Sequence, residues 1–270
     1  TTGNEVLKFE KKINSYLKCK YSISCNSGTS AIFLALQTID LSKNDIILMP
    51  SINFVASYNV AKILGAKVFL TDVDKYSGQM TPKNVFDCIK KFKLKKIKAI
   101  LLMYNGGYPD NAEKFYNFKK KYNCFIIEDA CHALGSSYKI KNKTYKIGSC
   151  KHADISTFSL HPLKTITTGE GGLVTTNSKE FFNKMELLRS LGIKKSINKH
   201  WKYDVLFNSF NFRLNDFQCA LGSSQLKKID KFINSRKKIY ETYNKFLKDI
   251  KEINLRKKNN FSSPSYHLYL

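Results

Sequence analysis

Short apolar runs alternate with segments of helical periodicity over the first 160 residues, and this alternation most narrows the folds open to the chain. The runs are continuously apolar, as in strands that are buried on both faces of a parallel sheet. The segments between them carry apolar residues every three or four positions, which is typical of helices packed on such a sheet. The expected strands are residues 21–25, 45–50, 66–74, 97–104, 123–130 and 154–160. The sequence therefore predicts an α/β fold with a mainly parallel sheet.

The helical segments continue past these strands. The expected helices between them are residues 5–17, 29–39, 53–65, 81–92 and 111–122. The helix at 81–92 has Thr81 as a candidate N-cap and Pro82 at its first helical position. From about residue 178 the pattern becomes mostly helical, over 178–192 and again over 214–250. About twenty residues follow the last helix, which is too few for a second domain.

The formal net charge of +25 would fit a nucleic-acid-binding protein. The lysines are nevertheless spread along the whole chain, mostly on the polar faces of expected helices. We therefore interpret them as a solvated surface and expect no nucleic-acid partner. A positive field would still attract a small anionic substrate.

Seven cysteines are scattered along the chain, with no C-x-x-C pair and no spacing typical of zinc ligands. They are interpreted as reduced, buried thiols, which indicates a cytoplasmic protein without a metal site. No signal peptide is visible, and no apolar run approaches the roughly 18 residues of a membrane span. We therefore expect no membrane association.

The turn "NSGTS" joins the strand at 21–25 to the next helix. Free amides at a helix N-terminus, together with small hydroxyl side chains, make an anion site. Ser27, Gly28, Thr29 and Ser30 are therefore candidates for binding a phosphate. The alternative interpretation is an ordinary N-cap turn.

The segment "FIIEDACHALGS" ends a very apolar strand with Glu128 and Asp129, and His132 follows three residues later. In an open parallel sheet, ligands bind at the carboxyl ends of the strands. A carboxylate there must find a cationic partner or be desolvated at a cost. A helix-capping Asp remains the alternative, and no further ligands are spaced for a metal.

Lys164 lies in "STFSLHPLKTITTGEGG", after another buried strand and among hydroxyl residues and glycines. This setting does not resemble a solvated helix face. A partly buried amine loses its proton more easily and can then act as a nucleophile, as Schiff-base lysines do. A turn lysine without a catalytic role is the alternative.

Together, an anion pocket, an acid at a strand end and a nucleophilic lysine suggest pyridoxal 5′-phosphate (PLP). This cofactor needs a phosphate cradle, an anion for its pyridinium nitrogen and a lysine for its aldehyde.

The motifs "NSGTSA", "NFVAS", "EDACHALGS", "FSLHPLKTITTGEGG" and "FNFRLNDFQCALGSSQL" resemble, in order and spacing, those of the DegT/DnrJ/EryC1/StrS sugar aminotransferases. The resemblance covers essentially the whole chain. It implies a fold-type-I, PLP-dependent homodimer with active sites shared between the subunits. It also implies a three-layer α/β/α large domain over residues 1–230. Residues 231–270 would then form a connecting helix and the start of a C-terminal small domain that is largely absent.

The resemblance also assigns roles to residues. Lys164 would be the catalytic residue bonded to the cofactor, Asp129 would pair with the pyridinium nitrogen, and His132 would lie near the ring's 3-hydroxyl. The remaining cofactor-binding residues would be Gly28, Thr29, Ser30 and Ser159 around the phosphate, Phe54 on the ring face, and Asn211 at the phosphate of the neighbouring subunit's cofactor.

The implied reaction moves an amino group from glutamate to the C4 ketone of a nucleotide-linked 4-keto-6-deoxy sugar. The segment 148–172 and the late "YHLY" most resemble members that aminate a UDP-linked N-acetyl-L-hexosamine for pseudaminic acid. Relatives that dehydrate sugars carry histidine where this chain has Lys164, so a sugar dehydratase is the weaker alternative. A non-catalytic, truncated relative with a basic surface is the other.

The chain departs from the usual family pattern in three places. Ser209 and Phe210 stand where relatives usually have Gly-Tyr, beside Asn211. The segment 103–111 replaces one that often carries a histidine near the sugar, which leaves the substrate open. Relatives usually continue for roughly a further hundred residues as a smaller C-terminal domain, so we expect either that this sequence is a fragment or that the domain is supplied elsewhere.

Overall fold

The computed structural model describes residues 3–196, 198, 201–256 and 259–270. Its main sheet has seven strands in the order β1-β9-β8-β5-β4-β2-β3. All of them run parallel except β9, which is antiparallel to both neighbours. This confirms the predicted α/β fold with a mainly parallel sheet. The strands are β1 (Tyr21–Cys25), β2 (Ile46–Pro50), β3 (Lys67–Thr71), β4 (Ala99–Met103), β5 (Phe125–Asp129), β8 (Ile155–Ser159) and β9 (Gly172–Thr176).

Helices pack on both faces of this sheet. Successive side chains of a strand point to opposite faces, so neighbouring residues of one strand contribute to different cores. Ile126 of β5 belongs to the core beneath one helical layer, and its neighbour Ile127 belongs to the core beneath the other. The first layer contains α1 (Asn4–Leu17), α4 (Pro82–Lys91), α5 (Ala112–Tyr122) and α7 (Asp216–Leu226). The second contains α2 (Gly28–Thr38), α3 (Ala56–Ile63) and α6 (Lys179–Arg189). Burial on both sides of the sheet explains the continuously apolar sequences of strands such as β2 and β4.

The expected helix ends agree closely with the structure. Thr81 caps α4 in a reciprocal pair with Asn84, and Pro82 occupies the first turn. Helix α3 begins at Ala56, three residues later than expected, so Phe54 lies in the loop before it.

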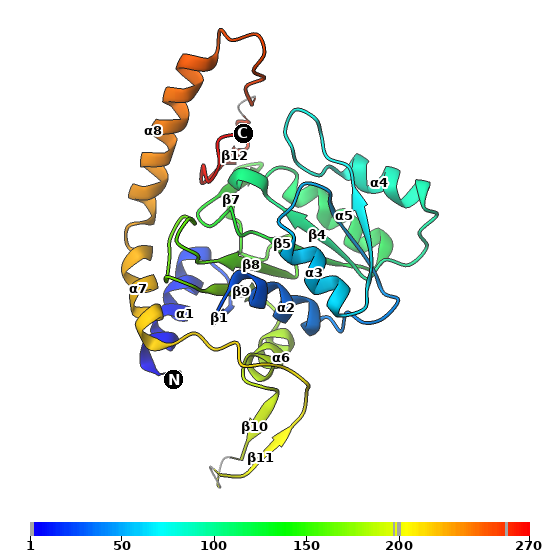
Figure 1. The fold of residues 1–270 in the computed structure, drawn as a ribbon, viewed down its shortest axis with the longest axis vertical. Helices are drawn as coiled ribbons and strands as arrows, with labels where there is room; N and C mark the ends of the chain where they lie inside the picture. Colours follow the sequence, from blue (N-terminus) through cyan, green and yellow to red (C-terminus); the bar gives the residue numbers. More distant parts are fainter. Residues whose placement is uncertain (1–2, 197, 199–200, 257–258) are drawn as a thin grey trace.

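Strand β9 of the main sheet and two short sheets were not expected from the sequence. The strands β6 (Ser137–Ile140), β7 (Lys143–Lys146) and β12 (Ser262–Ser263) form one, and β10 (Ile193–Lys195) pairs with β11 (Tyr203–Val205) in the other. The β10–β11 hairpin projects away from the main sheet (Figure 1).

The long helical stretch at 214–250 divides into α7 and α8 (Ile229–Leu247). Figure 1 shows α8 along one side of the molecule, with the C-terminal residues returning between it and the main sheet. Within the part of the chain that the structure describes, no helix is long and apolar enough to cross a membrane.

Candidate functional site

The carboxyl ends of the central strands bring the predicted site residues to one edge of the sheet. Cys25 at the end of β1 lies opposite Gly172 of β9, and Gly172 also lies opposite Ser159 at the end of β8. Asp129, the last residue of β5, lies opposite Thr157, two residues before Ser159. The start of α2, Ser159 and Asp129 therefore share the edge where open α/β sheets bind ligands.

The first turn of α2 provides free donors for an anion. Ser27 is the N-cap, and its hydroxyl accepts a hydrogen bond of 3.0 Å from the Ser30 amide. The Ser30 hydroxyl lies 2.6 Å from Asn26 Oδ1, to which it donates. Among the described residues, the amides of Gly28 and Thr29 have no partner. Free amides at the positive end of a helix fit the phosphate of PLP.

Gly28 packs against the end of β8. A Cβ atom at this position would lie 2.8 Å from Ser159 Cβ, closer than real Cβ atoms approach. Glycine therefore lets the helix N-terminus approach the strand end and places Ser159 beside the free amides. The Ser159 hydroxyl accepts a hydrogen bond of 3.3 Å from the His161 amide.

Asp129 is 3% exposed, and both of its oxygens accept hydrogen bonds. Ser57 Oγ donates to Oδ2 at 2.9 Å, and the Cys131 amide donates to Oδ1 at 3.2 Å. No cation among the described residues forms an ion pair with this carboxylate. Because a buried carboxylate without a counter-charge is costly, the site fits a ligand that brings a positive charge, such as a pyridinium.

His132 follows β5 and lies against the C-terminal segment. Its Nδ1 accepts a hydrogen bond of 3.3 Å from the Gly106 amide, which assigns the proton of the neutral ring to Nε2. Its ring centroid lies 4.2 Å from that of His267. Burial, together with the nearby charge of Lys164, lowers the pKa of His132 to about 4, so the ring is neutral at pH 7.

Lys164 lies half-buried in the loop between β8 and β9. Its amide donates to the carbonyl of His161 at 2.9 Å, and the Thr167 hydroxyl donates to the Leu160 carbonyl at 2.9 Å. After burial, the positive charge of Lys164 contributes to the low pKa of both His132 and His267. The bond from the Thr167 hydroxyl to the Leu160 carbonyl stabilises the loop that carries Lys164.

The last two predicted residues lie on the surface of this chain. Phe54 is 69% exposed in the loop before α3. Asn211 is also exposed, and its carbonyl accepts a hydrogen bond of 3.3 Å from Asn26, just before the first turn of α2. Asn211 also lines a surface cavity of about 870 Å³ with Arg189 and Arg213. The structure thus brings Asp129, His132, Ser159, Lys164 and the start of α2 to one edge of the sheet, but it leaves Phe54 and Asn211 exposed.

Sequence reasoning missed several residues at this edge. Ser57, which bonds to Asp129, is buried in α3, and His267 comes from the C-terminal segment. Asn53 precedes Phe54, and both polar atoms of its side chain are buried without a partner among the described residues. A serine in a helix or a histidine in a tail carries no local signal of such contacts. In the sequence, only the resemblance of the motif "YHLY" to family members draws attention to His267.

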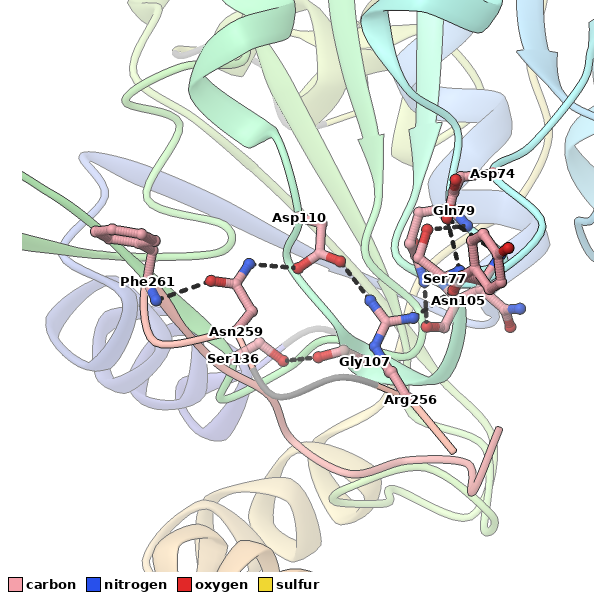
Figure 2. A network of polar contacts seen from close by, with 11 residues as sticks. Asp74, Ser77, Gln79, Asn105, Gly107, Asp110, Ser136, Arg256, Asn259 and Phe261 are labelled. Atoms are coloured by element: carbon pink, nitrogen blue, oxygen red, sulfur yellow. Dashed lines mark hydrogen bonds and ion pairs between the residues drawn. The ribbon is translucent and has the colours of Figure 1, made fainter. Parts of the chain in front are cut away.

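The segment 103–111 is tied to the C-terminal part of the chain (Figure 2). The Arg256 guanidinium pairs with Asp110, donates to the Ser77 carbonyl and lies 4.0 Å from the centre of the Tyr108 ring. Asn259 Nδ2 adds a bond of 3.2 Å to the other Asp110 oxygen. Arg256 and Asn259 therefore hold the segment 103–111, the one whose sequence leaves the identity of the sugar undecided.

Comparisons with known proteins agree with this geometry. Residues 1–270 match the DegT/DnrJ/EryC1/StrS aminotransferase family. A UDP-4-amino-4,6-dideoxy-N-acetyl-beta-L-altrosamine transaminase of Campylobacter jejuni is 39% identical over 269 residues, which are 100% of this chain and 69% of that protein. A GDP-perosamine synthase of Escherichia coli O157:H7 is 32% identical over 96% of this chain and 67% of its own length.

Solved structures agree as well. PseC of Helicobacter pylori, described as an aminotransferase involved in the biosynthesis of pseudoaminic acid, superposes with a TM-score of 0.85 at 31% identity, over 100% of this chain and 70% of PseC. The PMP form of a sugar aminotransferase from Streptococcus pneumoniae shares the fold, with a TM-score of 0.86 at 23% identity over 100% of this chain and 71% of that one.

Proposed function

The chain belongs to the DegT/DnrJ/EryC1/StrS aminotransferase family, and we propose that it aminates the C4 ketone of a nucleotide-linked 4-keto-6-deoxy sugar with glutamate as donor. The family is PLP-dependent and acts on nucleotide sugars. One observation carries the proposal for this chain. At one edge of the sheet lie a buried carboxylate with no ion-pair partner and two helix amides with no hydrogen-bond partner among the described residues, together with a half-buried lysine.

PLP supplies the electron sink that stabilises negative charge at the carbon next to the transferred nitrogen. The amides of Gly28 and Thr29, with Ser30 and Ser159, would bind its phosphate. Asp129, oriented by Ser57, would hold the proton on its ring nitrogen, and His132 would contact the ring's 3-hydroxyl. Phe54 would cover one ring face.

Lys164 would form the covalent attachment and, once released, would act as the general acid and base. Its Nζ would take the proton from the α-carbon of glutamate and deliver it to the cofactor carbon C4′. In the sugar half-reaction, Nζ would move a proton in the opposite direction, from C4′ to C4 of the sugar. His132 stays neutral at pH 7, so it adds no positive charge beside this amine.

The names of the relatives support the identity of the proposed sugar, and the net charge of the chain supports an anionic substrate. Two transaminases of Campylobacter jejuni, at 39% and 36% identity, are named for a UDP-linked 4-amino-4,6-dideoxy sugar. We therefore propose UDP-2-acetamido-2,6-dideoxy-4-keto-L-hexose as the substrate, for a pseudaminic acid-type surface glycan. The net charge of +25 suits collection of an anionic nucleotide diphosphate.

We further propose a cytoplasmic homodimer in which Asn211 reaches the cofactor phosphate of the partner subunit. The exposure of Phe54 and Asn211 is consistent with a second subunit covering them. Residues 1–230 would be the large domain, and residues 231–270 the connecting helix and the start of the small one. Lys164 argues against a dehydratase, which has histidine there.

A substrate panel tests the proposal. The PLP-loaded protein is incubated with glutamate and with UDP-, dTDP- and GDP-linked 4-keto-6-deoxy sugars, and the products are identified by mass spectrometry and NMR. We expect amination at C4 of the UDP-linked N-acetylated sugar. Dehydration, or no amination of any sugar by protein that carries PLP, would contradict it.

A further inference from the structure

Arg236 of α8 donates hydrogen bonds to the backbone on both sides of the proposed active site. Its Nη2 lies 3.2 Å from the carbonyl oxygen of Lys164 and 3.3 Å from that of Leu163. Its Nη1 lies 3.2 Å from the carbonyl oxygen of His267. One guanidinium therefore joins α8, the lysine loop and the C-terminal segment.

These bonds are the only hydrogen bonds that the described residues make to the carbonyls of Leu163 and Lys164. Within the loop, the Lys164 amide donates to the carbonyl of His161 and the Leu163 amide to His161 Nδ1, while Thr167 and Thr168 donate to the carbonyl of Leu160 at the base. Among the described residues, Arg236 is thus the group from outside the loop that bonds to the carbonyls at its lysine-bearing tip.

The guanidinium suits this role better than an ammonium would. It is planar, stays charged and offers several N–H donors in fixed directions. Arg236 is half-buried, and hydrogen bonds from a charged donor are stronger than neutral ones. It can span three carbonyls from two segments at once, whereas a lysine side chain is a single point of charge.

The C-terminal segment around His267, which accepts one of the Arg236 hydrogen bonds, is also held by other contacts. The His267 amide donates to the Gly106 carbonyl at 2.9 Å, and Ser265 Oγ donates to the His132 carbonyl at 2.7 Å. The C-terminal segment is therefore fixed to the end of β5 and the turn after β4. Arg236 connects this fixed segment to the tip of the lysine loop.

We propose that Arg236 is a positioning residue that holds the Lys164 backbone where its amine can reach the cofactor aldehyde. The inference rests on the proposed role of Lys164. Condensation of the Lys164 amine with the aldehyde releases one water and leaves a carbon–nitrogen double bond, which borohydride reduces to a stable secondary amine. Arg236 takes no part in this bond and acts only through the loop.

Two ligands separate positioning from the shape of the pocket. PLP can bond to Lys164, whereas pyridoxamine 5′-phosphate has the same ring and phosphate but no aldehyde. The dissociation constant of pyridoxamine 5′-phosphate divided by that of PLP, both measured by titration of the cofactor-free protein, reports how much the covalent bond to Lys164 tightens binding. Arg236→Gln should reduce this ratio at least about tenfold, because small misplacements of a reacting group have large effects. The affinity for pyridoxamine 5′-phosphate should stay unchanged.

Two further variants complete the test. Lys237→Gln removes an exposed cation from the next position of α8 and should leave the ratio as in the wild type. Arg236→Lys should reduce the ratio less than Arg236→Gln, and it decides the matter if Arg236→Gln does not fold. An unchanged ratio in the Arg236 variants, or an equal loss of affinity for both ligands, overturns the inference alone. A wild type without a borohydride-trapped adduct on Lys164 overturns the proposed function and this inference with it.

Discussion

Ser57 Oγ donates a hydrogen bond of 2.9 Å to Asp129 Oδ2, although the two residues are 72 positions apart in the sequence. Both side chains are buried, and the bond links α3 to the end of β5. It fixes the direction of the carboxylate proposed to hold the ring nitrogen of PLP.

Ser57→Ala should destabilise the protein by about 1.5–3 kcal/mol, because it removes a hydrogen bond to a charged, buried group. The free energy of unfolding of the cofactor-free protein in urea measures this loss. Ser27→Ala, which removes a cap at the start of α2, provides a comparison, with an expected loss of about 1 kcal/mol. Equal stability of Ser57→Ala and the wild type would contradict the role given to Ser57.

The ion pair of Glu10 and Arg189 should be sensitive to substitution, because both side chains are buried. The two residues are 8% and 9% exposed, and Glu10 Oε1 also accepts hydrogen bonds from the amide and hydroxyl of Ser24 in β1. Arg189→Met should cost about 3–5 kcal/mol, because it leaves a buried carboxylate without its counter-charge. Lys83→Met, which breaks an exposed pair with Asp87, should cost less than about 1 kcal/mol in the same urea experiment. Similar losses for the two variants would refute the distinction.

The neutral histidines make stability depend on pH. Burial, followed by the charge of Lys164, lowers the pKa of His132 to about 4; burial, His132, Lys164 and Arg236 lower that of His267 to about 3. An unfolded histidine takes up its proton near pH 6.5, whereas the folded ones do not until the pH is much lower. The stabilisation is thus present above about pH 6.5 and is lost as the pH falls toward 4, by at most about 1.4 kcal/mol per pH unit for each ring.

His132→Gln should flatten this dependence by about one proton between pH 6.5 and pH 4. Urea unfolding at a series of pH values, with wild type and variant side by side, isolates the contribution of His132 from those of other groups. Parallel curves for the two proteins would show that His132 is protonated in the folded state.

Gly28→Ala should weaken binding of PLP, because the added Cβ would meet Ser159 Cβ at 2.8 Å and push the helix amides away. Loss of one hydrogen bond to the charged phosphate costs about 1.5–3 kcal/mol, or at least about tenfold in the dissociation constant. Gly169→Ala offers a matched control, because nothing lies within 4 Å of a Cβ there, although its positive φ strains the backbone. Unchanged PLP affinity in Gly28→Ala would argue against a phosphate at this helix.

The central parallel strands could be predicted because they are buried on both faces, so that apolar residues run without interruption in β4 and β5. Strand β9 could not, because it follows directly on the glycine-rich loop and is half polar. The strands of the hairpins could not. The side chains of β11 are all exposed, and those of β7 are exposed or half-buried, so backbone pairing rather than apolar burial defines them. The break between α7 and α8 at Lys227 and Lys228 also carries no glycine or proline to mark it.

The site divides in the same way. Asp129 and Lys164 stand out locally, because a charged residue ends an apolar strand in one case and a lysine lies among glycines and hydroxyls in the other. Ser57, Arg236 and His267 lie at the site only because the fold brings α3, α8 and the C-terminal segment next to it. Their roles depend on contacts between segments that no local pattern records.

The central claim is that Lys164 is the catalytic lysine, and borohydride trapping tests it most directly. The PLP-loaded protein is reduced, digested and analysed by mass spectrometry, and the rate of amino transfer from glutamate is measured in parallel. The reduced cofactor should be found on the peptide that contains Lys164. Lys164→Ala should abolish this adduct and slow the half-reaction by at least about 10²–10⁴-fold, while Lys151→Ala, at an exposed position, changes neither. An adduct on another lysine, or amino transfer by Lys164→Ala at the wild-type rate, would contradict the claim.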